Sequence, residues 1–163
     1  MKKLIIFSLL FLVFLNLEAQ KKPQSLWEIL KGKELESSIT FLPVGIHTKD
    51  LEVFGVWYTS YNYKSYELAV FKNSFGDFTI AALYKRKQEI TKNFSVIYGL
   101  GVMHGYHGKM QNVDGIPFRK TFLWTGEINP VGGLSLDYKI SKKTSLQLSL
   151  TPLVFVYGFR YII

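Results

Sequence analysis

The chain has 163 residues, the length of a single domain, and 48% of its side chains are hydrophobic and 16% aromatic. This composition excludes a disordered chain, and the lack of cysteine excludes a disulfide scaffold, a thiolate metal site and a cysteine nucleophile. The net charge of +8 favours an anionic surface as partner.

The first segment has the pattern of an export signal. Two lysines follow Met1, an apolar run from Leu4 to Leu15 comes next, and Ala19 supplies a small residue before Gln20. The run is shorter than the ~20 residues that a membrane-spanning helix needs. The pattern therefore predicts a signal peptide over residues 1–19, cleaved after Ala19. Export argues against nucleic acid as the anionic partner.

A short amphipathic helix is predicted over residues 24–35, within a segment that covers residues 20–37. Leu26, Trp27 and Leu30 would lie on one side and the lysines elsewhere. Gly32 weakens the second half of this helix. The pattern fits a helix on a membrane interface and a helix packed on its own domain equally well.

From Ser38 onward the hydrophobic pattern changes to a period of two, which is typical of strands. The alternation predicts eight strands of about the length that a tilted membrane-spanning strand needs. A long connection, 105–129, follows the fifth strand. The predicted strands cover residues 38–46, 52–61, 65–74, 78–87, 92–104, 130–140, 143–151 and 153–162.

These strands predict an all-β fold: an eight-stranded, antiparallel, up-and-down membrane β-barrel over residues 38–163. Closure removes the unpaired strand edges that lipid cannot hydrogen-bond. A secreted soluble barrel of the lipocalin type has a similar pattern. We favour the membrane, and specifically the outer membrane, because strands 94–102, 144–150 and 155–163 keep apolar side chains where a soluble barrel would carry charge. An eight-stranded barrel excludes a wide pore and allows one small ligand.

Few side chains could carry chemistry. His47 closes the first predicted strand, and His104 and His107 follow the fifth. Ser74 lies at a strand end beside a tight turn, in the stretch FKNSFGD. We interpret His104 and His107 as loop histidines rather than metal ligands, and expect neither a metal nor a cofactor.

Several of these residues fall in the order of a known family. The FKNS motif at Phe71–Ser74 and the GLGVMHG motif at Gly99–Gly105 resemble those of the lipid A palmitoyltransferases, the PagP family. The similarity spans about residues 30–163 and includes the predicted topology. It also extends to single residues at matching places, namely Pro43, His47, Pro130 and Pro152.

The resemblance implies transfer of a fatty acyl chain from a phospholipid to lipid A by an outer membrane enzyme. His47 and Ser74 carry over as site residues, whereas Asn73 stands where the family has aspartate. An amide cannot act as a base, although it could donate to an oxyanion. Asp77 or Asp50 could supply the missing carboxylate. Ser74 could orient His47 or act as the nucleophile, and the alternative is that all of them are rim and turn residues.

The resemblance and the alternation also predict where substrate binds. Gly99 and Gly101 share a face, so an inward orientation would leave a slot for an acyl chain; the alternative is close packing of strands. Pro43, Pro130 and Pro152 cannot donate to a ladder. The resemblance implies that such gaps are lateral entrances for lipid, and the alternative is simple strand termination.

The sequence thus predicts a monomeric outer membrane acyltransferase with a phospholipid donor and lipid A or lipopolysaccharide as acceptor. A non-catalytic outer membrane barrel that binds acyl chains or lipopolysaccharide is the alternative, and an exported soluble carrier is a third hypothesis. Basic residues near presumed strand ends and the long connection could hold lipopolysaccharide phosphates, among them Lys85, Lys87, Lys109 and Arg119.

Overall fold

The computed structural model describes residues 25–47, 55–114, 116, 118–151 and 154–163. The chain forms two compact units, residues 1–32 and 33–163. The signal peptide predicted over residues 1–19 lies outside the described residues.

The first unit contains helix α2, Leu26–Lys31. Ser25 and Glu28 form a capping box, in which each side chain accepts a hydrogen bond from the other residue's backbone N–H. The helix ends at Gly32, whose φ of 51° lies in the left-handed region. The helix predicted over residues 24–35 is therefore shorter than expected, because glycine at that position favours termination. Within the described part of the chain, none of the helices has the length and apolar character needed to cross a membrane.

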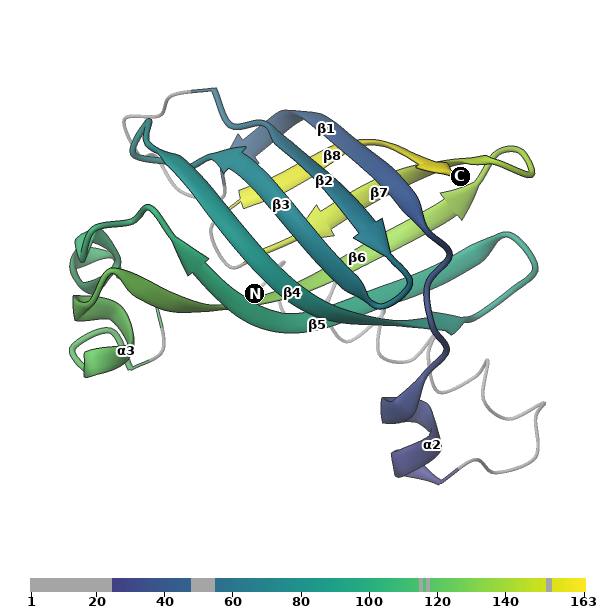
Figure 1. The fold of residues 1–163 in the computed structure, drawn as a ribbon, viewed down its shortest axis with the longest axis horizontal. Helices are drawn as coiled ribbons and strands as arrows, with labels where there is room; N and C mark the ends of the chain where they lie inside the picture. Colours follow the sequence, from purple (N-terminus) through teal and green to yellow (C-terminus); the bar gives the residue numbers. More distant parts are fainter. Residues whose placement is uncertain (1–24, 48–54, 115, 117, 152–153) are drawn as a thin grey trace, which may run out of the picture. The chain divides into compact units, whose positions relative to one another are not determined.

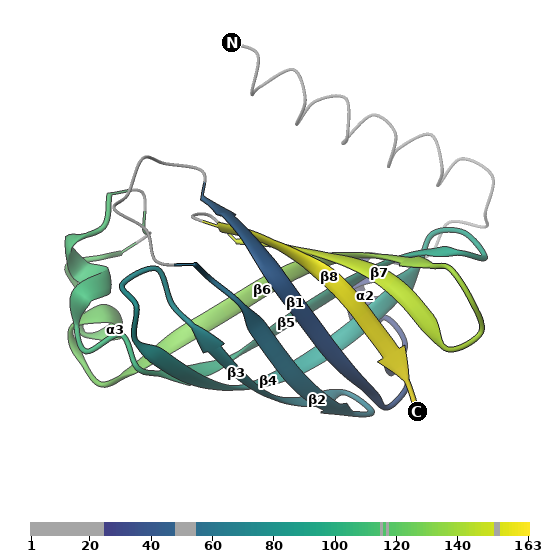
Figure 2. The same cartoon turned by 90° about the horizontal axis from the view of Figure 1, so that it is seen from above.

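The second unit is a closed antiparallel barrel in which each strand pairs with its sequence neighbours and β8 returns to β1 (Figures 1 and 2). This confirms the predicted eight-stranded up-and-down architecture. The strands are β1 Ser38–His47, β2 Tyr58–Tyr63, β3 Tyr66–Lys72, β4 Phe78–Glu89, β5 Phe94–His104, β6 Ile128–Lys139, β7 Thr144–Leu150 and β8 Val154–Ile162.

The two ends of the barrel differ in their connections. At one end, here called the turn end, short turns join β2 to β3, β4 to β5 and β6 to β7. At the other, here called the loop end, the β5–β6 connection contains the 3₁₀ helix η1, Lys109–Asn112, and the single-turn helix α3, Phe122–Thr125 (Figure 1). Met110, Val113 and Ile116 of this connection are buried against the interior of the barrel.

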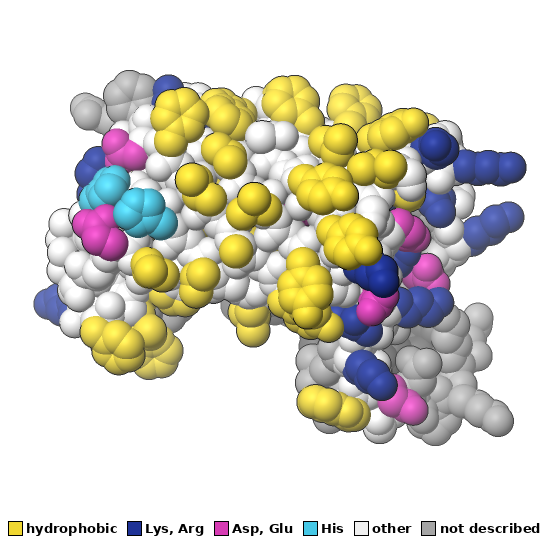
Figure 3. Space-filling view, viewed as in Figure 1, with side chains coloured by type: hydrophobic (Ala, Val, Ile, Leu, Met, Phe, Trp, Pro, Cys, Tyr) yellow, Lys and Arg dark blue, Asp and Glu magenta, His cyan; other side chains and the backbone are white. Residues whose placement is uncertain are grey.

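Side chains alternate between the interior and the outside, as the period of two predicts. The outer face is a broad band of exposed apolar side chains between the two ends (Figure 3). In β8, for example, Phe155, Tyr157, Phe159 and Tyr161 are exposed, while Arg160 is 2% exposed. A soluble barrel would expose charge instead, so the distribution is that of a barrel with an apolar environment.

The second and third predicted strands differ from the observed ones for identifiable reasons. Residues 52–54 of the second lie outside the described residues, residues 55–57 are not in a strand, and β2 begins at Tyr58. It runs to Tyr63, because the β2–β3 turn needs only Lys64 and Ser65. Lys64 has a φ of 53°, as a tight two-residue turn requires. The third ends at Lys72 rather than residue 74, because Asn73 begins a turn of its own.

Candidate functional site

His47 and Ser74 meet at the loop end. His47 is the last residue of β1, and Ser74 lies two residues after the end of β3. In the barrel, β2 lies between these two strands. His47 Nε2 lies 3.0 Å from Ser74 Oγ, so the two side chains share a hydrogen bond. Ser74 is buried and His47 half-buried. The structure thus joins two residues that the sequence predicted for the site and that are separated by 27 positions.

Asn73 holds the turn that positions Ser74. Its Oδ1 accepts hydrogen bonds from the backbone N–H groups of Phe75 and Asp77, at 2.9 and 3.1 Å. Its Nδ2 donates to Thr79 Oγ1 and to the carbonyl of Gly105, at 3.0 and 3.1 Å. Because both amide atoms are engaged, Asn73 positions the turn, and it also lines the cavity described below. An aspartate could not make the two donations, which is a physical reason for an amide at this position.

Asp77 does not pair with His47. Its Oδ2 lies 2.5 Å from Lys109 Nζ, which ties the β3–β4 turn to η1. Asp50, the other candidate carboxylate, lies outside the described residues. Among the described residues, therefore, Ser74 is the polar partner that the structure shows for His47.

Ser74 lines a cavity of about 370 Å³ in the loop half of the barrel, a volume within the usual range for small-molecule sites. Its walls are mostly apolar, and side chains of the β5–β6 connection cover it: Tyr106, Met110, Ile116 and Trp124. Burial raises the pKa of Tyr106 to about 12, so this residue keeps its phenol proton at neutral pH. An apolar cavity with Ser74 in its wall, and His47 bonded to that serine, is suited to a ligand with a hydrocarbon chain and one reactive polar group.

The glycines of the cavity wall are not the predicted ones. A Cβ at Gly101 would lie 2.0 Å from the Ala82 carbonyl oxygen, and one at Gly99 would lie 2.6 Å from Lys85 Cγ. These two glycines allow β4 and β5 to approach closely, which corresponds to the packing alternative. Gly133 on β6 lines the cavity, and a Cβ there would meet nothing within 4 Å. The alternation along β6 predicts that Gly133 faces the interior, since it shares a face with the buried Ser135 and Asp137.

Two of the three prolines lie beside breaks in the hydrogen-bonded ladders. The described pairs of the β1–β2 ladder end at Leu42, and Pro43 follows at once, inside a bulge in the β1–β8 ladder. Pro130 lies in the stretch 128–133 of β6, which pairs with β5; the described pairs with β7 begin only at Leu134. Pro130 also lines the cavity. Pro152 lies outside the described residues.

A buried ion pair borders the cavity on the side of the turn end. Lys85 Nζ lies 2.6 Å from Glu67 Oε1, both side chains are less than a tenth exposed, and the Tyr58 hydroxyl donates to the same carboxylate. Sequence reasoning missed this group because it placed Lys85 and Lys87 at strand ends. Both point inward and are buried, so neither is available to lipopolysaccharide. Their inward orientation follows from the alternation with Ala81 and Leu83.

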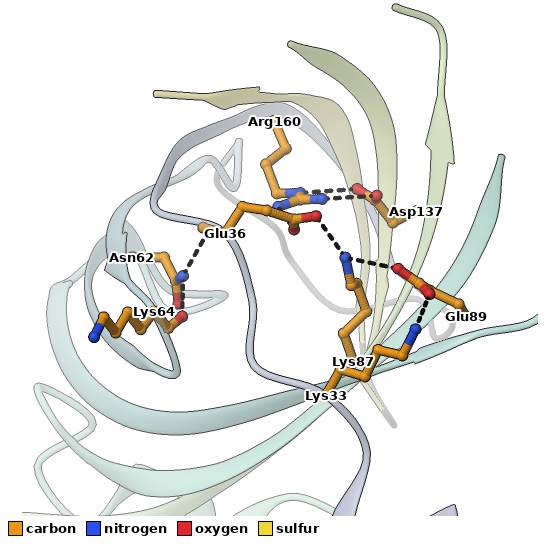
Figure 4. A network of polar contacts seen from close by, with 8 residues as sticks. All are labelled: Lys33, Glu36, Asn62, Lys64, Lys87, Glu89, Asp137 and Arg160. Atoms are coloured by element: carbon orange, nitrogen blue, oxygen red, sulfur yellow. Dashed lines mark hydrogen bonds and ion pairs between the residues drawn. The ribbon is translucent and has the colours of Figure 1, made fainter. Parts of the chain in front are cut away.

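A larger polar network fills the turn half of the barrel (Figure 4). Arg160 binds Asp137 in a bidentate pair, with Nε–Oδ1 and Nη2–Oδ2 distances of 3.0 and 2.9 Å. Lys87 binds Glu36 at 2.7 Å and Glu89 at 3.3 Å. Lys33 pairs with Glu89, and its backbone bridges that of Lys87. The residues before β1 thereby close the turn end.

The other predicted basic and histidine residues of the long connection are exposed or paired. Arg119 pairs with Asp114, and Lys109 with Asp77 as described above. His107 Nδ1 lies 2.8 Å from Glu127 Oε2, and His104 Nδ1 lies 3.1 Å from the Glu127 carbonyl. No group of three or more potential metal ligands is found among the described residues.

Comparison with known proteins gives a fold and no family. No protein-family model and no curated protein matches the chain. A solved structure described as "De novo design of transmembrane beta-barrels" is similar, with a TM-score of 0.52 and 12% identity. The match covers 81% of this chain and 99% of the designed chain. The chain therefore has the fold of a transmembrane β-barrel.

Proposed function

We propose that this chain is an outer membrane acyltransferase, which moves a fatty acyl chain from a phospholipid to lipid A or a related lipid acceptor. The observation that carries the proposal is that Ser74, which lines an apolar cavity, shares a hydrogen bond with His47. The apolar outer band of the barrel supports a membrane location (Figure 3). The motifs shared with the lipid A palmitoyltransferases support the choice of lipid substrates.

In the proposed reaction, the acyl chain occupies the cavity with its ester beside Ser74. Ser74 Oγ gives its proton to His47 Nε2 and attacks the ester carbonyl carbon. The bond from that carbon to the glycerol oxygen breaks, and the oxygen takes the proton from His47 as the lysophospholipid leaves. A hydroxyl of the acceptor then gives its proton to His47 and attacks the acyl carbon. The bond from that carbon to Ser74 Oγ breaks, and Ser74 Oγ takes the proton from His47.

The ladder breaks at Pro43 and Pro130 support the route by which lipid would reach the cavity. Among the described residues, the ladder pairs do not extend across β1–β2 beyond Leu42 or across β6–β7 before Leu134, and strands separate more easily where such pairs are missing. Pro130 and Gly133 lie in the same stretch of β6 and both line the cavity. We therefore place the entrance for the acyl chain between β6 and β7 and the entrance for the acceptor between β1 and β2.

The test is transfer of a labelled acyl chain from phospholipid to lipid A by the full chain in mixed micelles. We expect the His47→Ala and Ser74→Ala variants each to lose about 100-fold or more in rate. His104→Ala is the matched control, since His104 is an exposed histidine of the same end whose side chain contacts Glu127 and not Ser74. A labelled protein adduct should form in the parent chain and be absent in Ser74→Ala. Equal transfer by all variants would contradict the proposal.

The non-catalytic alternative is favoured by one observation: among the described residues, no carboxylate orients His47, and Asn73 is committed to its turn. A barrel of that kind would copurify with acyl chains in the cavity to the same extent with and without His47 and would transfer none. Mass spectrometry of bound lipid in the His47→Ala variant distinguishes the two functions.

A further inference from the structure

We propose that the turn end of the barrel is a binding surface for the headgroups of anionic phospholipids. The surface consists of Lys64 in the β2–β3 turn, Lys92 in the β4–β5 turn, and Lys142 and Lys143 in the β6–β7 turn. All four side chains are exposed. Figure 3 shows Lys and Arg side chains projecting at this end. The inference rests on the membrane location proposed above and is independent of acyl transfer.

The charges of the two ends are distributed differently. The connections at the turn end, residues 33–37, 64–65, 90–93 and 140–143, carry five basic and two acidic residues. The described connections at the loop end carry three basic and three acidic residues. Of the basic residues at the loop end, Lys109 and Arg119 have carboxylate partners. For the four lysines of the surface, the described residues provide no such partner, so their charge is available to an external anion.

Tyrosines place these lysines at the depth of a lipid headgroup. Four outward-facing tyrosines lie near the strand ends next to the turns and are about half exposed or more: Tyr63, Tyr66, Tyr138 and Tyr161. Tyrosine prefers the boundary between hydrocarbon and water. Lys64 Nζ lies 5.8 Å from the centre of the Tyr63 ring, and Lys143 Nζ lies 5.8 Å from that of Tyr161. The ammonium groups therefore lie just beyond the aromatic boundary, where phosphodiesters of the leaflet lie.

The chemistry of the occupant follows from this geometry. A lysine ammonium is a compact point charge with three donors and binds phosphate oxygens without demanding a fixed orientation. Four such groups on three separate turns fit several mobile headgroups around the rim better than one rigid ligand. The structure thus assigns the turn end to a leaflet of glycerophospholipids with net negative charge, such as phosphatidylglycerol.

The test uses the full chain reconstituted in nanodiscs that contain phosphatidylcholine and phosphatidylglycerol. Native mass spectrometry measures the ratio of the two lipids that remain bound to the released barrel. A lysine near a membrane surface contributes roughly 1 kcal/mol, so we expect Lys142→Gln/Lys143→Gln to reduce the preference for phosphatidylglycerol about tenfold or more. The preference of the parent chain should also weaken with added salt.

The matched control is Arg119→Gln/Lys120→Gln, an adjacent basic pair at the loop end, which should keep the preference. Free glycerol phosphate should not displace the bound lipid, because the surface needs the bilayer to present its headgroups. An equal preference in the parent chain and in Lys142→Gln/Lys143→Gln would overturn the inference, as would an equal loss in both double variants. A barrel that inserts without any preference refutes this inference alone, whereas failure to insert also refutes the proposed membrane location.

Discussion

The two halves of the barrel interior are built by the same strands and have opposite chemistry. The loop half contains the apolar cavity, with Ser74 in its wall. The turn half contains two buried cations, Lys87 and Arg160, in contact with the carboxylates Glu36, Glu89 and Asp137 (Figure 4). A third cation, Lys33, is exposed and also pairs with Glu89. Charge neutrality makes this half a closed polar plug, since buried charges are tolerated when each is paired.

The comparison shows that the ligand cavity and the charged plug occupy different parts of the barrel axis. Eight strands enclose little more than the volume of their own side chains, so a ligand cavity requires small or absent side chains over part of the length. Here the cavity lies where Ala81, Gly132 and Gly133 face or border it. The long side chains of the plug fill the remainder and restrict the cavity to one end. A substitution in the plug should therefore mainly change the stability of the barrel, whereas one in the cavity wall should mainly change the volume that a ligand can fill.

The largest effect is expected at the plug. Arg160→Ala removes the bidentate partner of Asp137, whose side chain is 4% exposed, and leaves an uncompensated buried carboxylate. We expect a loss of about 3–5 kcal/mol in the free energy of unfolding, measured by urea titration in detergent or lipid. Lys143→Gln at the same end should change it by no more than about 0.5 kcal/mol. A small loss for Arg160→Ala would show that the plug does not stabilise the barrel.

A smaller effect is expected from two glycines in the loop half. Gly101→Ala places a methyl group against the backbone of β4, which cannot rotate away, so we expect a loss of about 1–3 kcal/mol. Gly133→Ala points a methyl group into open cavity and should cost no stability, while reducing the cavity that ligand can fill. Unfolding midpoints of the two variants give the comparison. Similar midpoints would mean that the close approach of β4 and β5 is not required.

The smallest effect is a pH dependence at Glu36. Burial raises the pKa of this carboxyl, but the hydrogen bond from Lys87 and the charges of Lys87 and Arg160 lower it by more, so the pKa lies below its ordinary value of 4.5. The stabilisation from Glu36 is thus complete above the unfolded pKa and is lost as the pH falls through the lower, folded pKa. The difference in unfolding midpoint between the parent chain and Glu36→Gln should be constant at neutral pH and shrink below pH 4.5. Glu34→Gln, at an exposed position nearby, should follow the parent chain. If the difference in unfolding midpoint between the parent chain and Glu36→Gln grew as the pH falls, the prediction would be contradicted.

The strands were more predictable than the site. Bounds of β1, β4, β5, β6, β7 and β8 agree with the alternation to within a few residues, because the period of two is a property of the local chain. His47 and Ser74 could be named from their positions at strand ends and from the family motifs. The roles of Asn73 and Asp77 could not, since they depend on partners in other turns, Gly105 and Lys109.

The sequence by itself determined that alternate side chains of the strands from Ser38 onward face two different environments, and it predicted eight such strands. It did so because these are consequences of spacing along the chain. Only the tertiary structure decided which inward residues meet: His47 with Ser74, Arg160 with Asp137, and open space beside Gly133 rather than Gly101. Those contacts depend on the register between strands and on closure around the barrel, which bring together residues far apart in the chain.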